Sequence, residues 1–216
     1  MNANTQMQLS EELQNFIRAI KPSDHIGLFY DDVESKRSIA FNYLADGLEK
    51  SRGVVYVCGE ENPENVRKGL ASLGVDVEPN ERSGNLLIRN FDEWYIERGK
   101  ADPYKIMNRW YEVAKTFGEK GLGARVAGEV STFYREKMVK ELLRYEYALN
   151  KTISFPIEAM CIYDLNIIVE TGYTSTIMPI VKAHGKTIFV SKGKHVLIEP
   201  DKIDEADVEK LLELKI

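Results

Sequence analysis

Acidic residues stand at the ends of five apolar segments of the chain. In chain order, these ends are Tyr30-Asp31-Asp32, Gly59-Glu60-Glu61, Asn90-Phe91-Asp92, Gly128-Glu129 and Tyr163-Asp164. Carboxylates gathered at one edge of a sheet can hydrogen-bond a ligand or act as a general base. Acids also favour helix N-termini because of the helix dipole alone. A shared functional site and simple helix capping therefore stand as two open explanations.

The loop after the first apolar segment has the position of a phosphate-binding loop but not its composition. Such a loop has the pattern G-x-x-x-x-G-K-[ST], whose glycines let backbone N–H groups approach phosphate. The stretch YDDVESKR at residues 30–37 keeps only Lys36, with Ser35 before it and Arg37 after it. Its three acids would repel a polyphosphate, by roughly 1–4 kcal/mol for each pair of like charges about 4 Å apart. We expect Ser35, Lys36 and Arg37 to form a degenerate phosphate loop that does not bind a triphosphate tightly.

Strand-like and helix-like segments alternate along the chain and must position these residues. The predicted strands are residues 25–30, 54–58, 85–89, 124–130, 159–164, 187–191 and 195–199. The predicted helices, with their caps, are residues 10–20, 36–50, 62–74, 102–118, 131–150 and 204–214. Unbroken apolar runs such as VVYVC and AMCIY are typical of strands that are covered on both faces. We therefore predict a three-layer α/β fold with a doubly wound, mostly parallel sheet and an antiparallel hairpin on one edge, at Lys192-Gly193-Lys194.

No linker or internal repeat divides the chain. We expect residues 1–22 to form an amphipathic helical appendage and residues 23–216 to form a single domain. In open α/β sheets, ligands bind outside the carboxyl ends of the strands, where the winding reverses. That rule places any small-molecule site at the acidic strand ends.

The composition excludes several classes of protein. Lys plus Arg number 29 and Asp plus Glu number 34, which gives a net charge of −5. Because there is no basic block, we expect no direct binding of nucleic acid. The two cysteines, Cys58 and Cys161, lie in apolar runs, which excludes a disulfide scaffold and indicates a reducing compartment. With no leader sequence and no apolar stretch of about 18 residues, we expect a cytoplasmic protein that does not bind membranes.

Several residues near the strand ends carry both a structural and a functional interpretation. His25 begins a strand and is expected either to hydrogen-bond a neighbour or to be a polar group of a pocket. Glu129 interrupts an apolar strand end, which favours a place in the pocket. Tyr30 and Tyr163 are either core residues or aromatic walls of a mostly apolar small-molecule site.

No spacing such as C-x-x-C or H-x-x-x-H indicates a metal centre. Cysteines in apolar runs more often fill a core than bind a ligand. We therefore predict no metal and no cofactor, and we expect His184 and His195 at the surface. A looser metal site is kept as a minor alternative, made of His25, Glu129, Cys161 and Asp164.

Two resemblances add to these observations. The run from Phe41 to Glu64, which contains VVYVCGEE, resembles the KaiC and RecA-like ATPases, in which a strand ending in paired glutamates supplies the catalytic carboxylate. A closer resemblance is to the MEDS domain, the sensory domain of DcmR-type regulators from methanogens and methylotrophs. It rests on HIGLFY at residues 25–30, RVAGE at 125–129 and CIYD at 161–164, and it spans about residues 24–200.

The MEDS resemblance implies a RecA-like sheet that has lost its phosphate loop and become a ligand sensor. The implied ligands are small hydrocarbon derivatives, such as halogenated or methylated one-carbon compounds. The RecA comparison implies the strand order 3-2-4-5-1-6-7, with the last pair antiparallel.

We therefore expect a prokaryotic signal-transduction protein without catalytic turnover, which binds a small molecule and signals to a regulatory protein partner. The expected ligand-binding residues are His25, Tyr30, Glu60, Glu129, Cys161, Tyr163 and Asp164. The alternative is a degenerate KaiC-like nucleotide-binding ATPase that uses Glu60, Glu61 and Lys36. A third reading is a scaffold that binds proteins through the helix at residues 10–20, and formation of a homo-oligomer is left open.

Overall fold

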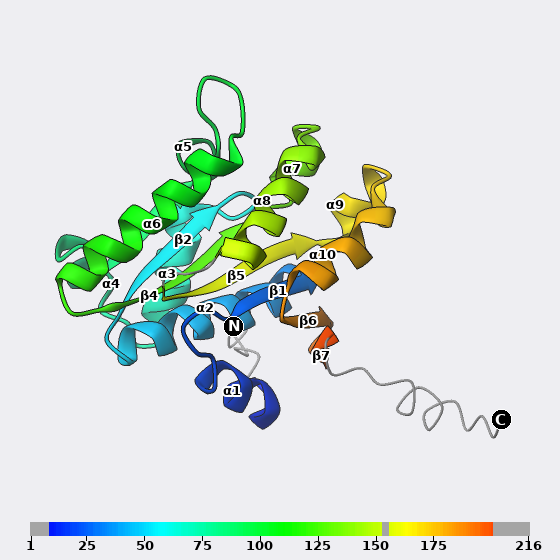
Figure 1. Ribbon diagram of the computed structural model, residues 1–216. Helices are drawn as coiled ribbons and strands as arrows, with labels where there is room; N and C mark the ends of the chain where they lie inside the picture. Colours follow the sequence, from blue (N-terminus) through cyan, green and yellow to red (C-terminus); the bar gives the residue numbers. More distant parts are fainter. Residues whose placement is uncertain (1–8, 153–155, 201–216) are drawn as a thin grey trace.

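The chain folds around one seven-stranded sheet, which the computed structural model describes over residues 9–152 and 156–200 (Figure 1). The strands are β1 (His25–Tyr30), β2 (Arg52–Cys58), β3 (Leu86–Asn90), β4 (Gly123–Glu129), β5 (Ile157–Asp164), β6 (Lys186–Ser191) and β7 (Lys194–Ile198). Their order is β3-β2-β4-β5-β1-β6-β7, and every neighbouring pair is parallel except β6 and β7. The predicted fold class and strand order are both confirmed.

Strands β6 and β7 form the predicted hairpin at one edge of the sheet. The turn residues Lys192 and Gly193 have φ angles of 46° and 76°. Two-residue hairpin turns need such positive angles to follow the twist of the strands. The turn is therefore short and fixed in shape.

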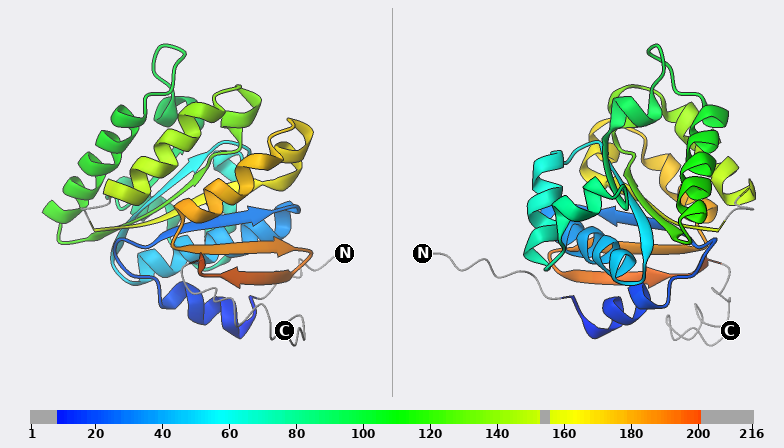
Figure 2. Two further views of the ribbon diagram at one scale, coloured as in Figure 1. Left: turned by 45° about the vertical axis from the view of Figure 1, so that its right-hand side comes forward. Right: turned by 90° about the vertical axis from the view of Figure 1, so that its left-hand side faces the viewer.

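Helices cover both faces of the sheet, as the right-hand view of Figure 2 shows. On one face lie α1 (Glu11–Arg18), α2 (Val33–Glu49), α3 (Pro63–Ser72) and α4 (Val77–Arg82). On the other face lie α5 (Phe91–Tyr95), α6 (Pro103–Glu119), α7 (Thr132–Arg135), α8 (Val139–Thr152), α9 (Leu165–Glu170), the 3-10 turn η1 (Thr174–Thr176) and α10 (Ile177–Ala183). Successive strand residues point to opposite faces, so Cys161 and Tyr163 join the core under α8 while Tyr30 and Ile162 join the core under α2.

The N-terminal helix α1 uses its apolar face inside the protein. Ser10 caps it by accepting a hydrogen bond from the N–H of Leu13 at 3.2 Å, as its sequence predicts. Leu13, Ile17 and Ile20 are buried in the same core as the inner face of α2. Because this face is covered, it is not free to bind a partner, which argues against the scaffold reading. Within residues 9–152 and 156–200, no helix has the length and apolar character needed to cross a membrane.

The prediction of a single helix over residues 131–150 is wrong. The chain breaks it into α7 and α8 at Lys137, whose φ is 56°. The Lys137 N–H donates to the Tyr134 carbonyl and the Met138 N–H donates to the Phe133 carbonyl, at 3.2 and 2.8 Å. This is the Schellman pattern of hydrogen bonds that ends a helix. Glycine usually occupies the position of positive φ in this motif, and because a lysine stands there the sequence did not reveal the end of the helix.

The helix predicted at residues 204–214 lies outside the described residues.

Candidate functional site

The predicted site residues fall into two groups on opposite faces of the sheet. Tyr30 and Glu129 belong to the side of α2, whereas His25, Cys161 and Tyr163 face α8. This separation follows from the alternation of side chains along a strand. The strand-end network, as we call the first group, also includes Glu60 and Asp164, whose charges act on Tyr30. Lys36 and Glu61 belong to it as well, because Lys36 contacts both Glu61 and Glu129.

Lys36 lies at the centre of the strand-end network and is almost completely buried. Its Nζ donates to Glu129 Oε1 at 2.5 Å and to Glu61 Oε2 at 3.1 Å. Arg37 donates to both oxygens of Glu61, at 2.8 and 3.0 Å. Burial alone would raise the pKa of Glu61, but the hydrogen bonds from Arg37 and Lys36 lower it to about 2. Both cations of the expected phosphate loop are thus neutralised by carboxylates of the same chain.

The turn after β2 binds the carboxylate of Glu129. Its Oε2 accepts the backbone N–H groups of Gly59, Glu60 and Glu61 at 2.8, 2.8 and 2.7 Å. The hydroxyl of Tyr56 donates to Oε1 at 2.8 Å. A Cβ at position 59 would lie 2.7 Å from the Glu129 carbonyl oxygen, so only glycine fits this approach. Three converging N–H groups form an anion site of the kind that elsewhere holds phosphate, and here a side chain fills it.

The polar groups of the connection from β1 to α2 are also paired with groups of the same chain. It has two residues, Asp31 and Asp32, between Tyr30 and Val33. Asp32 caps α2 by accepting the Ser35 N–H at 2.8 Å, and its other oxygen accepts the Lys192 N–H at 2.7 Å. The Ser35 hydroxyl oxygen accepts the Gly193 N–H at 3.0 Å. Ser35 and Asp32 therefore hold the β6–β7 turn.

Glu60 is the member of the network with an unused hydrogen-bonding atom. Its Oε1 accepts a hydrogen bond from Thr132 at 3.1 Å, while Oε2 is buried and has no partner among the described residues. Burial, followed by the charge of Glu129, raises the pKa of Glu60 to about 8. Burial and the charges of Glu60 and Asp164 also raise the pKa of Tyr30. This corner favours a neutral ligand that hydrogen-bonds Glu60, or a cation that stabilises the ionised form of Glu60.

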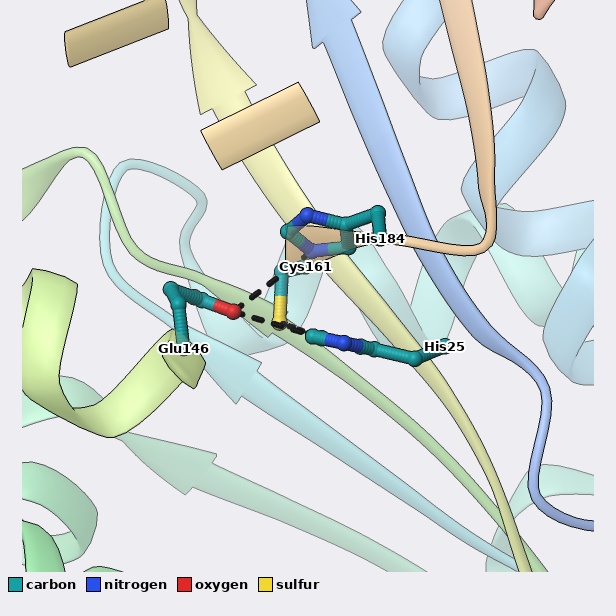
Figure 3. Close-up of side chains that lie close together, drawn as sticks. All are labelled: His25, Glu146, Cys161 and His184. Atoms are coloured by element: carbon teal, nitrogen blue, oxygen red, sulfur yellow. Dashed lines mark hydrogen bonds and ion pairs between the residues drawn. The ribbon is translucent and has the colours of Figure 1, made fainter. Parts of the chain in front are cut away.

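The second group is a buried cluster made by His25, Glu146, Cys161 and His184 (Figure 3). The Nε2 of His25 lies 3.2 Å from Glu146 Oε2 and 3.5 Å from Cys161 Sγ. The Nε2 of His184 lies 3.5 Å from the same Glu146 oxygen. Burial lowers the pKa of both histidines to about 3, so both are neutral at pH 7. Tyr163 lies beside the cluster, with its ring at 5.9 Å from that of His184.

Sequence reasoning missed two members of this cluster. His184, predicted at the surface, is 2% exposed, so that prediction is wrong. His195, which is not part of the cluster, is half-buried, and its Nε2 lies 3.0 Å from a carboxylate oxygen of Glu12. Glu146 lies on the buried face of α8, next to Tyr145. An acidic residue on the apolar face of a helix was the sequence signal that could have identified it. The four residues of the minor metal alternative do not lie together, because Glu129 and Asp164 lie in the strand-end network and not with His25 and Cys161.

A groove of about 550 Å³ lies away from both groups. It runs between α1, α2 and the α3–α4 connection, where Gln14, Asn42 and Asp76 are among its lining residues. None of the seven expected ligand-binding residues lines it. Any ligand at the strand ends must therefore use a separate opening.

Comparison with known proteins agrees with the sequence motifs and the sheet. Residues 24–184 match the family model described as MEDS, MEthanogen/methylotroph, DcmR Sensory domain. Among solved structures, the fold is similar to a KaiC-like protein from the hyperthermophilic archaeon Pyrococcus horikoshii OT3, with a TM-score of 0.57, 17% identity, and coverage of 83% of this chain and 79% of that chain. A search of curated proteins finds no match. At this identity the KaiC-like neighbour shows a shared fold alone, whereas the family model covers most of the sequence, and the chain belongs to the MEDS family of sensory domains.

Proposed function

We propose that this chain is a sensory protein that binds a small neutral or cationic organic molecule beside Tyr30, Glu60 and Asp164 and signals to a protein partner. Membership of a sensory family supports the role. A one-carbon or hydrocarbon derivative, such as a methylated amine or an alcohol, has the hydrogen-bonding groups that the proposal requires. No catalytic turnover is proposed.

The observation that carries the proposal is the unpaired Oε2 of Glu60 beside a fully neutralised Lys36. A buried carboxyl oxygen without a partner costs about 1–3 kcal/mol whether or not it carries the proton, and a ligand that hydrogen-bonds it would recover that cost. An anion entering the same corner would meet the carboxylate of Asp164, and its charge would oppose ionisation of Glu60, while Lys36 and Arg37 remain paired with Glu61. Electrostatics therefore favours ligands other than nucleoside phosphates.

In this proposal the two faces of the sheet have separate roles. Glu129 accepts the backbone N–H of Glu60 and so holds the turn that carries this residue in place. His25, Cys161 and Tyr163 lie on the opposite face and do not touch the same ligand. Changes at the corner would reach a partner through α7, because Thr132 in α7 binds Glu60.

A thermal-shift screen tests the proposal with methylated amines, methanol, halomethanes and magnesium-ATP. A ligand at 100 times its dissociation constant should stabilise the protein by about 2.7 kcal/mol. The variant Glu60→Gln should lose that shift because it changes the unpaired acceptor, while Glu112→Gln, an exposed change on α6, should keep it.

Two results would contradict the proposal. Stabilisation by an organic compound that is equal in wild type and Glu60→Gln would place the ligand elsewhere, with the groove beside α1 as the next site to examine. Stabilisation by magnesium-ATP, together with hydrolysis that Lys36→Ala abolishes, would favour the degenerate ATPase.

A further inference from the structure

We propose that His25, Glu146, Cys161 and His184 bind a divalent transition metal ion, with zinc as the best fit to these donors. The set holds two imidazole nitrogens, one sulfur and one carboxylate, all of which are zinc ligands in proteins. A thiolate also favours zinc over magnesium or calcium. This inference goes beyond the sensory role and does not rest on it.

The spacing of the donor atoms is close to that of a tetrahedral centre. Zinc bonds of about 2.0–2.3 Å place neighbouring donors roughly 3.3–3.6 Å apart. Three pairs already lie at 3.2, 3.5 and 3.5 Å: His25 with Glu146, His25 with Cys161, and His184 with Glu146. All four donors lie within 4.8 Å of one another, so the widest pair needs to close by at most about 1.2–1.5 Å.

The hydrogen bonds of the two histidines turn both Nε2 atoms toward the cluster. Nδ1 of His25 lies 3.1 Å from the carbonyl oxygen of Ala183, and Nδ1 of His184 lies 2.7 Å from that of Ile180. A carbonyl oxygen only accepts, so each Nδ1 must carry the proton and each Nε2 is left with a lone pair. Backbone carbonyls hold metal-binding histidines in this same way.

The hydrogen bonding of the inward-facing atoms is incomplete. Both oxygens of Glu146 and Nε2 of His184 are buried without a hydrogen bond of ordinary geometry among the described residues. With Glu146 ionised, as a metal ligand must be, lone pairs of nitrogen and oxygen face each other at 3.2–3.5 Å. A divalent cation bound to a thiolate, a carboxylate and two neutral imidazoles gives a centre of zero net charge. Such a centre can be buried at far lower cost than an unpaired ion.

The four donors come from separate elements and would be tied together by the metal. His25 begins β1, Cys161 lies in β5, Glu146 lies in α8, and His184 follows α10. Gly27 leaves room for this packing, since a Cβ there would lie 3.3 Å from the His184 ring. All four side chains are buried, so the centre is closed to solvent and has a structural role, joining the helix layer to the two central strands.

Metal analysis and cobalt substitution on the full-length protein test the proposal. Protein purified without chelator should hold about one zinc per chain, and metal-free protein should regain thermal stability when zinc is added. Co(II) should give the near-ultraviolet thiolate charge-transfer band and the strong visible bands of a four-coordinate ion.

Matched variants identify the ligands. Cys161→Ser should remove the charge-transfer band, whereas Cys58→Ser, which changes the other buried cysteine, should keep it. Glu146→Gln should weaken cobalt binding at least about tenfold, while His195→Asn should leave it unchanged.

Any of three results would overturn the proposal: no retained metal and no cobalt band in the wild type, a band that survives in Cys161→Ser, or a band that is lost in Cys58→Ser. The wild-type measurement decides even where a variant fails to fold. A wild type that is indifferent to zinc would mean that the four side chains share protons among themselves.

Discussion

Replacing Glu129 with Gln removes the charge of a buried carboxylate while keeping the size of the side chain. Lys36 would keep only Glu61 as a counter-charge, and the new amide NH2 would face either three backbone N–H groups or the Lys36 ammonium. Breaking a buried ion pair by changing one partner costs about 3–5 kcal/mol. We expect Glu129→Gln to lower the free energy of unfolding by that amount.

Lys36→Met should cost less, about 2 kcal/mol, because both carboxylates keep other donors. Glu129 still has Tyr56 and the turn after β2, and Glu61 still has Arg37. In the double variant the unpaired ammonium of the first substitution is absent, so the two costs should not add. The expected coupling is about 1–3 kcal/mol.

Urea unfolding at pH 7, followed by circular dichroism, measures all four corners of this cycle, provided that the denaturant slope stays constant. Glu78→Gln is the control, because its ion pair with Arg82 is exposed, at 82% and 73%, and should matter by less than about 0.5 kcal/mol. A Glu129→Gln protein as stable as the control, or costs that add to within about 0.5 kcal/mol, would refute the reasoning.

Three further predictions follow from the described contacts. Glu129→Ala frees three backbone N–H groups and removes one of the two carboxylates paired with Lys36, so millimolar phosphate should raise the melting temperature of this variant but not of the wild type. Because the pKa of Glu60 is raised to about 8 from 4.5, the folded state holds a proton that the unfolded state releases, and stability should fall as pH rises from 4.5 to 8; urea midpoints of Glu60→Gln should lack this decline. Gly53→Ala should cost about 1–3 kcal/mol in urea unfolding, because its Cβ would lie 2.2 Å from a buried phenyl ring, whereas Gly118→Ala, with nothing within 4 Å, should be neutral or stabilising. An unaffected melting temperature in phosphate, a parallel pH profile, or equal effects at the two glycines would each contradict the corresponding contact.

The sheet was predictable because its strands are short apolar runs between clear breaks. The cap at Asn62 and the proline at position 63 likewise mark the start of α3. Lys137 has no such mark, since a lysine at the left-handed position gives no glycine signal, and the break between α7 and α8 was missed.

The candidate site was predictable only in part. Its strand residues were found, but His25 and Tyr30 are five positions apart in one strand, an odd number, and therefore face opposite sides. The alternation of side chains along a strand already predicts that these two residues lie on opposite faces of the sheet. The meeting of Glu146 and His184 depends on how α8 and α10 pack against each other on the sheet, which local patterns do not specify.

The long sequence separations in the strand-end network bear on the order of events in folding. Lys36 meets Glu61 across 25 residues and Glu129 across 93 residues, so large loops must close before these charges leave water. We therefore expect these contacts to form after the main folding barrier. Substitutions there should then leave the refolding rate nearly unchanged and speed unfolding. The network that fills the anion site would in that way set how long the native state persists once it has formed.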